Sequence, residues 1–171
     1  IKRYETFDEL YVYCYRVAST VGLMACEIFG YEGEKTLVYA EKLGIAMQLT
    51  NILRDIGEDA EMGRIYLPQE DLQKFGVSEE QIFTKKIDGN FIELMKFEIA
   101  RARQYYEESK TGIPMLSKDV RFTVFLALRL YSRILDEIER QNYDVFKQRA
   151  HTTKRQKLFS IPKIWLEARK F

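Results

Sequence analysis

The sequence contains few of the residues that interrupt or crosslink a chain. Its 171 residues include only three prolines and nine glycines, which is low for an all-β protein with many turns and compatible with long helices. Two cysteines, Cys14 and Cys26, are too few for a disulfide framework or a zinc site. We expect both to be small buried side chains, which points weakly to a reducing compartment.

The sequence also lacks an excess of charge of one sign and a long apolar run. The 27 lysines and arginines against 26 acidic residues give a net charge of +1, which excludes a general nucleic-acid-binding protein. No uninterrupted apolar run reaches about 18 residues, so we expect no transmembrane helix. The length and the 46% hydrophobic content predict one globular domain. Because the chain begins with Ile1 and shows no signal peptide, we expect a fragment or the ordered part of a longer, cytoplasmic protein.

Helical periodicity predicts an all-α fold. Apolar residues recur at spacings of three and four from position 7 to 29, and Gly30 then ends the helix. Several residues of this helix are small, which indicates either a closely packed neighbour or a cavity. Further helices are predicted at 34–59, 68–72, from 78 onward, 91–110, 119–141 and 158–170. Ser78 with Gln81 resembles a capping box, and Pro162 is expected in the first turn of the last helix.

One predicted helix carries a polar row on a face with apolar neighbours. At about 100° per residue, Asn51, Asp55 and Asp59 fall within an arc of about 80°, and Gln48 lies inside it. Polar groups that face inward need partners, and two carboxylates one turn apart repel each other. A Mg²⁺ ion resolves both problems, because it takes oxygen ligands and shares them with substrate phosphates.

Two arginines flank this row. Arg54 and Arg64 suit bidentate contacts with phosphate oxygens. Together with an apolar cleft, they indicate a ligand with a diphosphate head and an apolar tail. The alternative is a solvated acidic face on which both arginines form ordinary ion pairs.

Two segments resemble the signatures of the squalene/phytoene synthase family. Residues 13–24 (YCYRVASTVGLM) resemble the first, and Leu43-Gly44 through Gln48, Asn51, Arg54-Asp55 and Asp59 to Arg64-Ile-Tyr66-Leu-Pro68 resemble the second. The resemblance implies an all-α, isoprenoid synthase-type helical bundle. Residues 1–171 would form the C-terminal part of this single domain, without its N-terminal helices. The family's first aspartate-rich motif is not found in residues 1–12, so we expect half of a metal site.

The resemblance also implies roles for individual residues. Three would be magnesium ligands: Asn51, Asp55 and Asp59. Five would bind or enclose the diphosphate: Gln48, Asn51, Arg54, Arg64 and Tyr66. Four would act in catalysis: Asp55, Asp59, Tyr13 and Tyr131. The two tyrosines would reach one cavity, or alternatively be core rings whose hydroxyls find backbone acceptors. The small residues around Ala18 and Gly22 would form the floor of a prenyl tunnel.

The implied reaction is a Mg²⁺-dependent, head-to-head condensation of two prenyl diphosphates, farnesyl or geranylgeranyl. The product would be of the squalene, dehydrosqualene or phytoene type. One alternative is hydrolysis to a prenyl alcohol such as farnesol, and another is a non-catalytic assembly or scaffold homologue. The residues leave open whether NADPH reduces the product. His151, the only histidine, is given no role.

The C-terminal segment is strongly basic. Residues 147–171 carry eight lysines and arginines and one acid, Glu167, so their net charge is +7. Apolar and aromatic residues alternate with these charges, which predicts an amphipathic segment that rests on anionic lipid and makes the protein peripheral at a membrane. The alternative is a solvated helix packed on the domain.

Overall fold

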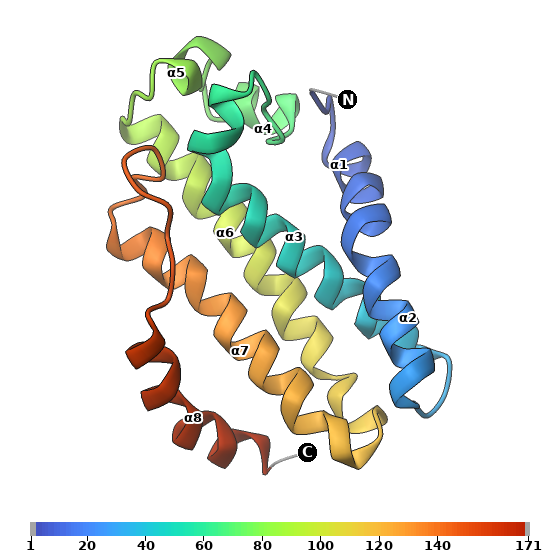
Figure 1. Cartoon of the computed structure of the whole chain (residues 1–171). Coiled ribbons are helices and arrows are strands. Elements are labelled where there is room, and N and C mark those ends of the chain that lie inside the picture. The colour runs from blue at the N-terminus through green and yellow to red at the C-terminus, as the bar shows by residue number, and fades with distance from the viewer. Residues whose placement is uncertain (1–2, 170–171) are drawn as a thin grey trace.

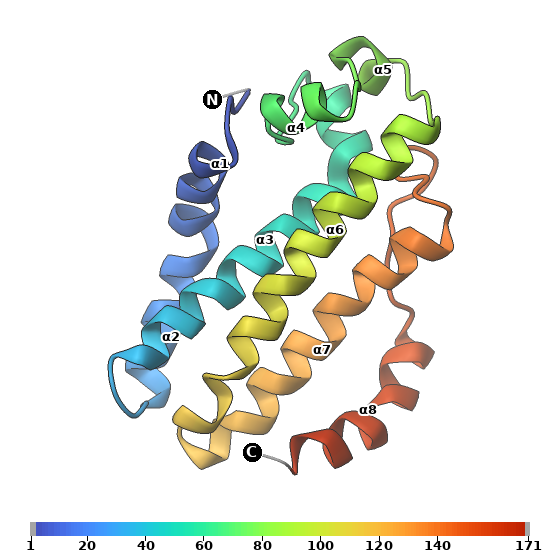
Figure 2. The same cartoon turned by 180° about the vertical axis from the view of Figure 1, so that it is seen from behind.

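The computed structural model describes residues 3–169 and confirms the all-α prediction (Figures 1 and 2). Within these residues the only β-type pairing is an isolated bridge between Tyr31 and Leu116. The helices are α1 (Phe7–Cys14), the π-helical segment η1 (Tyr15–Ser19), α2 (Thr20–Phe29), α3 (Lys35–Glu61), α4 (Gln69–Lys74), α5 (Glu79–Phe83), α6 (Gly89–Lys110), the 3₁₀ turn η2 (Ile113–Met115), α7 (Lys118–Arg140) and α8 (Lys154–Ala168).

Helix α3 lies at the centre of the bundle. It packs most extensively on α6 and also contacts η1, α2 and α7 (Figure 1). Its buried side chains follow the 3–4 spacing of an amphipathic helix: Ile45, Leu49, Ile52, Leu53 and Ile56. This apolar side fixes the rotation of α3, and its remaining surface carries the polar row.

The first predicted helix is continuous from 7 to 29 but contains the π-helical turn η1. Its buried positions step from Leu10 to Cys14 by four residues and then to Ser19 by five. A π turn adds one residue to the helical repeat, which explains the step of five. The periodicity therefore predicted the helix correctly but not the phase of its buried side.

The small residues of the first helix were expected to allow either a closely packed neighbour or a cavity, and the structure shows each at different positions. At Ser19, η1 approaches α3 so closely that a Cβ added to Gly44 would lie 2.5 Å from the Ser19 Cα. The Ser19 Oγ donates a hydrogen bond to the Glu41 carbonyl at 2.8 Å. Ala18 and Gly22 instead face a cavity. Both cysteines are buried and free, as expected, and burial raises the pKa of the Cys14 thiol to about 12.

The end of α3 is a glycine cap that positions the following loop. Gly63 has φ +69°, its N–H donates to the Ala60 carbonyl, and the Arg64 N–H donates to the Asp59 carbonyl at 2.9 Å. This is the pair of bonds of a Schellman motif. The cap therefore holds Arg64 one turn from Asp59.

The predicted cap of α5 is present in part. The Ser78 Oγ accepts from the Gln81 N–H, as predicted. The Gln81 side chain, however, donates to Asp88 and to the Lys86 carbonyl and does not complete a capping box.

Two expectations about the helices need correction. The last helix begins at Lys154, not at 158, because Thr153 and Gln156 form a complete capping box. Pro162 consequently lies inside α8 and not in its first turn. By length and composition alone, the helix over Phe7–Phe29 could cross a membrane, and 17% of its apolar window is buried inside the structure.

Candidate active site

An apolar cavity of about 500 Å³ lies between η1, α2, α3 and α7. On the side of η1 and α2, several lining residues are small and leave the space open: Ala18, Gly22, Ala25 and Cys26. Larger apolar side chains of α3, Leu43 and Met47, also line it. The cavity therefore has the character expected for an apolar tail.

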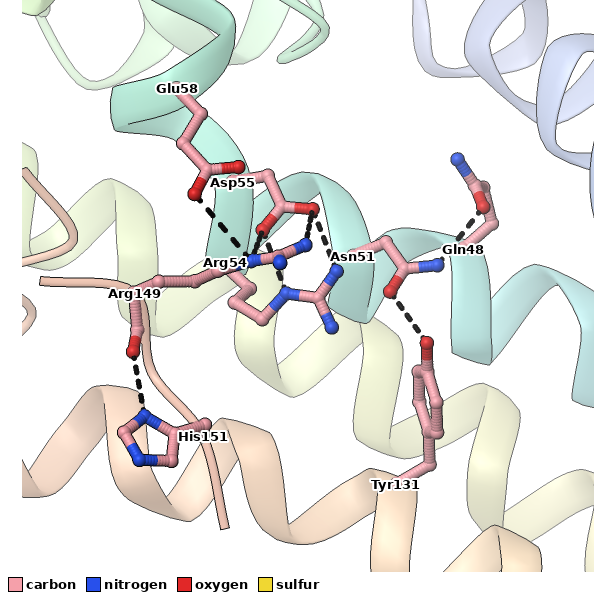
Figure 3. Close-up of polar contacts among 8 residues, drawn as sticks. All are labelled: Gln48, Asn51, Arg54, Asp55, Glu58, Tyr131, Arg149 and His151. Carbon is pink, nitrogen blue, oxygen red and sulfur yellow. Dashed lines mark hydrogen bonds and ion pairs between the residues drawn. The ribbon is translucent and has the colours of Figure 1, made fainter.

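The cavity lining includes a small polar cluster. Gln48, Asn51 and Tyr131 all line the cavity. The Tyr131 hydroxyl donates to the Asn51 Oδ1 at 2.7 Å, and the Asn51 Nδ2 donates to the Gln48 Oε1 at 3.3 Å (Figure 3). The structure thus brings together three of the residues predicted from sequence. Two of them, Asn51 on α3 and Tyr131 on α7, are 80 positions apart in the sequence.

One turn further along α3, two arginines hold Asp55. The Arg54 Nε donates to the Asp55 Oδ1 at 2.7 Å, and the Arg149 Nε donates to the same oxygen at 2.7 Å. The second carboxylate oxygen accepts from both guanidinium groups as well (Figure 3). Burial by itself raises the pKa of Asp55, but these hydrogen bonds and charges outweigh it and hold the pKa below its usual value.

Asp59 has a different environment. No side-chain hydrogen bond or salt bridge joins Asp59 to any other residue within 3–169. Burial and the nearby Asp55 carboxylate raise its pKa, and the charge of Arg64 opposes this rise. Asp59, Arg64 and Tyr66 line a second, very small cavity of about 10 Å³. The loop residues predicted to close the site are therefore located beside Asp59.

Tyr13 differs from its prediction. It is not among the residues that line the large cavity with Tyr131. Its ring packs instead against Tyr4 and Tyr66, with ring centroids 5.5 and 5.3 Å apart. Burial and the Tyr66 hydroxyl raise the pKa of Tyr13. The ring of Tyr13 therefore lies on the loop side of the site, beside Tyr66, and Tyr131 lies in the large cavity.

Sequence reasoning missed Arg149, which lies 94 positions from Asp55. It belongs to the loop between α7 and α8, and its side chain also lies 3.8 Å from Glu58 (Figure 3). The loop is anchored by the buried Val145 and Ala150. Its basic character was visible in the sequence, but it was interpreted as part of a membrane-facing segment. His151, which has no assigned role, contacts the Arg149 carbonyl through Nδ1 at 3.2 Å.

The oxygen donors of the polar row fit a hard divalent cation. Asn51 Oδ1 keeps a second lone pair beside its bond from Tyr131, and the half-buried Asp59 carboxylate lacks a cationic hydrogen-bond partner. Within residues 3–169, however, no group of three or more His, Cys, Asp or Glu side chains is close enough to hold a metal ion. The described residues therefore offer ligands for a metal without forming a closed site themselves.

Comparisons with known proteins agree with this architecture. The chain is 48% identical to the 15-cis-phytoene synthase of Synechococcus elongatus, over 97% of this chain and 58% of that protein. It is 50% identical to the chloroplastic phytoene synthase of Daucus carota, over 94% of this chain and 42% of that protein. The crystal structure of a dehydrosqualene synthase in complex with ligand superimposes with a TM-score of 0.94 at 34% identity, covering 100% of this chain and 60% of that one.

The chain thus spans between about two-fifths and three-fifths of the length of these relatives. A family model described as squalene/phytoene synthase matches residues 1–156, which include both signature segments and the polar row. The chain belongs to the squalene/phytoene synthase family.

Proposed function

We propose that this chain forms one wall of the active site of an enzyme that joins two prenyl diphosphates head to head. The observation that carries the proposal is the apolar cavity of about 500 Å³ with Gln48, Asn51 and Tyr131 in its lining. From Asn51 the polar row continues along α3 to Asp55 and Asp59. A prenyl chain fits the apolar part, and its diphosphate fits the polar row.

The cavity residues exclude water from the reacting prenyl groups. Ionisation of an allylic diphosphate leaves a cation that water would capture, whereas an apolar enclosure leaves a second prenyl double bond as the available nucleophile. No covalent enzyme nucleophile is needed. Tyr131 and Gln48 hold the Asn51 amide in one orientation through its oxygen and its nitrogen.

The polar row and the arginines bind the leaving diphosphate. Asn51, Asp55 and Asp59 would hold Mg²⁺, which when bound neutralises the leaving group as its C–O bond breaks. Arg54 and Arg149 already donate to Asp55, and the same guanidinium groups suit phosphate oxygens. Arg64 places a further positive charge beside Asp59.

For the substrate we propose geranylgeranyl diphosphate, with a phytoene-type C40 product. The relatives with 48–50% identity are named phytoene synthases, whereas the dehydrosqualene synthase structure shares 34% identity. The competing outcome is hydrolysis to the prenyl alcohol. Admitting one positioned water needs to shift the competing barriers by only about 1.4 kcal/mol to change the product ratio tenfold.

The test is Asp55→Asn in a full-length protein that contains this chain. The variant keeps the size of the side chain and removes its negative charge. We expect Mg²⁺-dependent turnover of geranylgeranyl diphosphate to fall by at least about 100-fold, with helicity by circular dichroism unchanged. Glu61→Gln on the same helix is the matched control, because Glu61 is exposed and pairs with Lys85. Wild-type turnover and metal dependence in Asp55→Asn would disprove the metal assignment.

Product analysis separates the three functions. Organic extraction and chromatography of labelled products should give a C40 head-to-head product as the major species. If the main products are free prenyl alcohol and diphosphate, the reaction is hydrolysis and not condensation. A folded full-length protein that consumes no substrate would support the scaffold alternative.

A further inference from the structure

Helix α8 packs on the bundle through one narrow face. Ser160 and Ile164 are its buried residues, and its neighbour is α7 (Figure 2). The contact is reinforced at both ends, by Gln156 Nε2 donating to the Glu137 Oε1 at 2.8 Å and by Arg129 pairing with Glu167 at 3.1 Å. These contacts fix which side of α8 faces away from the protein.

The side that faces away is apolar. Four large hydrophobic side chains project from it with exposed fractions of 51–79%: Leu158, Phe159, Trp165 and Leu166. At 100° per residue they lie within an arc of about 120°, opposite Ser160 and Ile164. A helix packed on a soluble domain ordinarily places its polar residues on the side that faces away from the domain. In α8 that side is apolar instead.

The charges of α8 are distributed with the same asymmetry. Its only acidic residue, Glu167, points toward α7 and pairs with Arg129. Arg155 and Arg169 lie within the apolar arc, and Lys154 and Lys163 border it. The Arg169 guanidinium lies 5.2 Å from the centre of the Trp165 ring. The outward face of α8 is therefore apolar and exclusively positive.

We propose that this outward face of α8 docks on the surface of an anionic lipid bilayer. An apolar face bordered by lysine and arginine is the pattern of helices that lie in the plane of a membrane interface. Aromatic rings and arginines are also common at protein interfaces, but a face with four apolar side chains, at least four cations and no carboxylate matches the chemistry of acyl chains beneath anionic headgroups. The proposal does not depend on the proposed reaction, and its failure would leave that reaction untouched.

The chain contains a reporter for this contact. Trp165 is its only tryptophan, and it is located on the proposed docking face. We expect its emission to shift to the blue when vesicles of phosphatidylcholine with 30% phosphatidylglycerol are added, and to be quenched when the lipid is brominated. Vesicles of phosphatidylcholine alone should produce little shift, and 0.5 M salt should reverse binding because it screens exposed charges.

Paired variants assign the contact to α8. Phe159→Ser with Leu166→Ser should lower vesicle partitioning on the order of tenfold or more, and Arg155→Gln with Lys163→Gln should lower it on the order of tenfold. The apolar control is Met24→Ser with Ile28→Ser, because these α2 residues are also exposed. The charge control is Lys86→Gln with Lys96→Gln, which removes two exposed cations elsewhere. Neither control should weaken partitioning comparably, and circular dichroism should show unchanged helicity.

Three results would overturn the proposal. One is equal partitioning to neutral and anionic vesicles. Another is loss of partitioning in the α2 control with none in the α8 variants, which would assign the contact to the Phe7–Phe29 helix. The third is a Trp165 shift that depends on protein concentration and not on lipid, with a dimer in sedimentation, which would make the face an interface between two copies.

Discussion

At the scale of single residues, two buried carboxylates share one guanidinium where α4 packs on α6. Glu98 and Asp71 are 2% and 4% exposed. The Arg101 Nη1 donates to Asp71 Oδ2 at 2.8 Å and to Glu98 Oε2 at 2.9 Å. Arg101 also lies over the rings of Phe7 and Phe97, 4.1 and 4.7 Å from their centres. Burial, opposed by Arg101 and reinforced by Asp71, raises the pKa of Glu98 to about 8.

This shift predicts a pH dependence of stability. The folded chain keeps a proton on Glu98 that the unfolded chain releases near the usual glutamate pKa of 4.5. The resulting stabilisation is complete below that value and is lost as the pH rises through about 8. We expect the free energy of unfolding to fall between pH 5 and 8, by at most about 1.4 kcal/mol per pH unit. Denaturant titrations should show this slope and its loss in Glu98→Gln.

The control for this measurement is Glu93→Gln, which changes an exposed carboxylate on the same helix. Its slope should match that of the wild type. A Glu98→Gln variant with an unchanged slope would show that another group titrates in this range.

At the scale of helices, periodicity and end signals predicted most of the fold. The long helices α3, α6 and α7 begin and end within two residues of their predicted limits, because each combines an amphipathic pattern with clear end signals. The predicted row from Gln48 to Asp59 lies on α3, since a regular helix fixes the positions of its residues. The phase of the first helix was missed because its π turn is stabilised by a tertiary contact with Gly44. Arg149 was missed because no local pattern determines where a loop docks.

The docking of that loop depends on Gly57. A Cβ added to Gly57 would lie 2.7 Å from the Val145 carbonyl oxygen and 3.1 Å from the Phe146 Cα. We therefore expect Gly57→Ala to push the loop outward and to cost about 1–3 kcal/mol of stability. Hydrogen exchange over residues 141–153 should increase, because Arg149 would lose its position on Asp55.

Gly89→Ala is the matched control, because nothing lies within 4 Å of the added Cβ. It should leave both exchange in the loop and stability close to those of the wild type. Normal loop protection in Gly57→Ala would mean that the backbone of α3 shifts instead.

At the scale of the whole molecule, residues 3–169 form one wall of a cavity. The chain spans 58% of the Synechococcus elongatus relative, and α2 leaves Val21, Met24 and Ile28 exposed beside the cavity. The described residues also lack a cluster of three His, Cys, Asp or Glu side chains for a metal. Binding of a diphosphate with its cations therefore requires groups in addition to those on α3.

This arrangement predicts that the 171-residue chain alone binds Mg²⁺ weakly and forms no coupled product. Calorimetric titration with Mg²⁺ should give no saturation at concentrations that saturate a full-length protein containing this chain. Incubation of both proteins with labelled geranylgeranyl diphosphate, followed by organic extraction, should give a C40 product only with the longer one. A coupled product from the 171 residues alone would refute the requirement for groups in addition to those on α3.

The π turn at Tyr15–Ser19 also has a consequence for how the chain tolerates changes in length. A π turn has the geometry of a one-residue insertion absorbed by a helix, so deleting one residue there would leave a regular α-helix in which the later residues keep their side. Gly22 and Cys26 would still face the cavity. Deleting a residue from the regular part of α2 or α3 would instead rotate everything after it by about 100°. The first helix therefore has one place, its π turn, at which a change of length leaves the cavity lining in position.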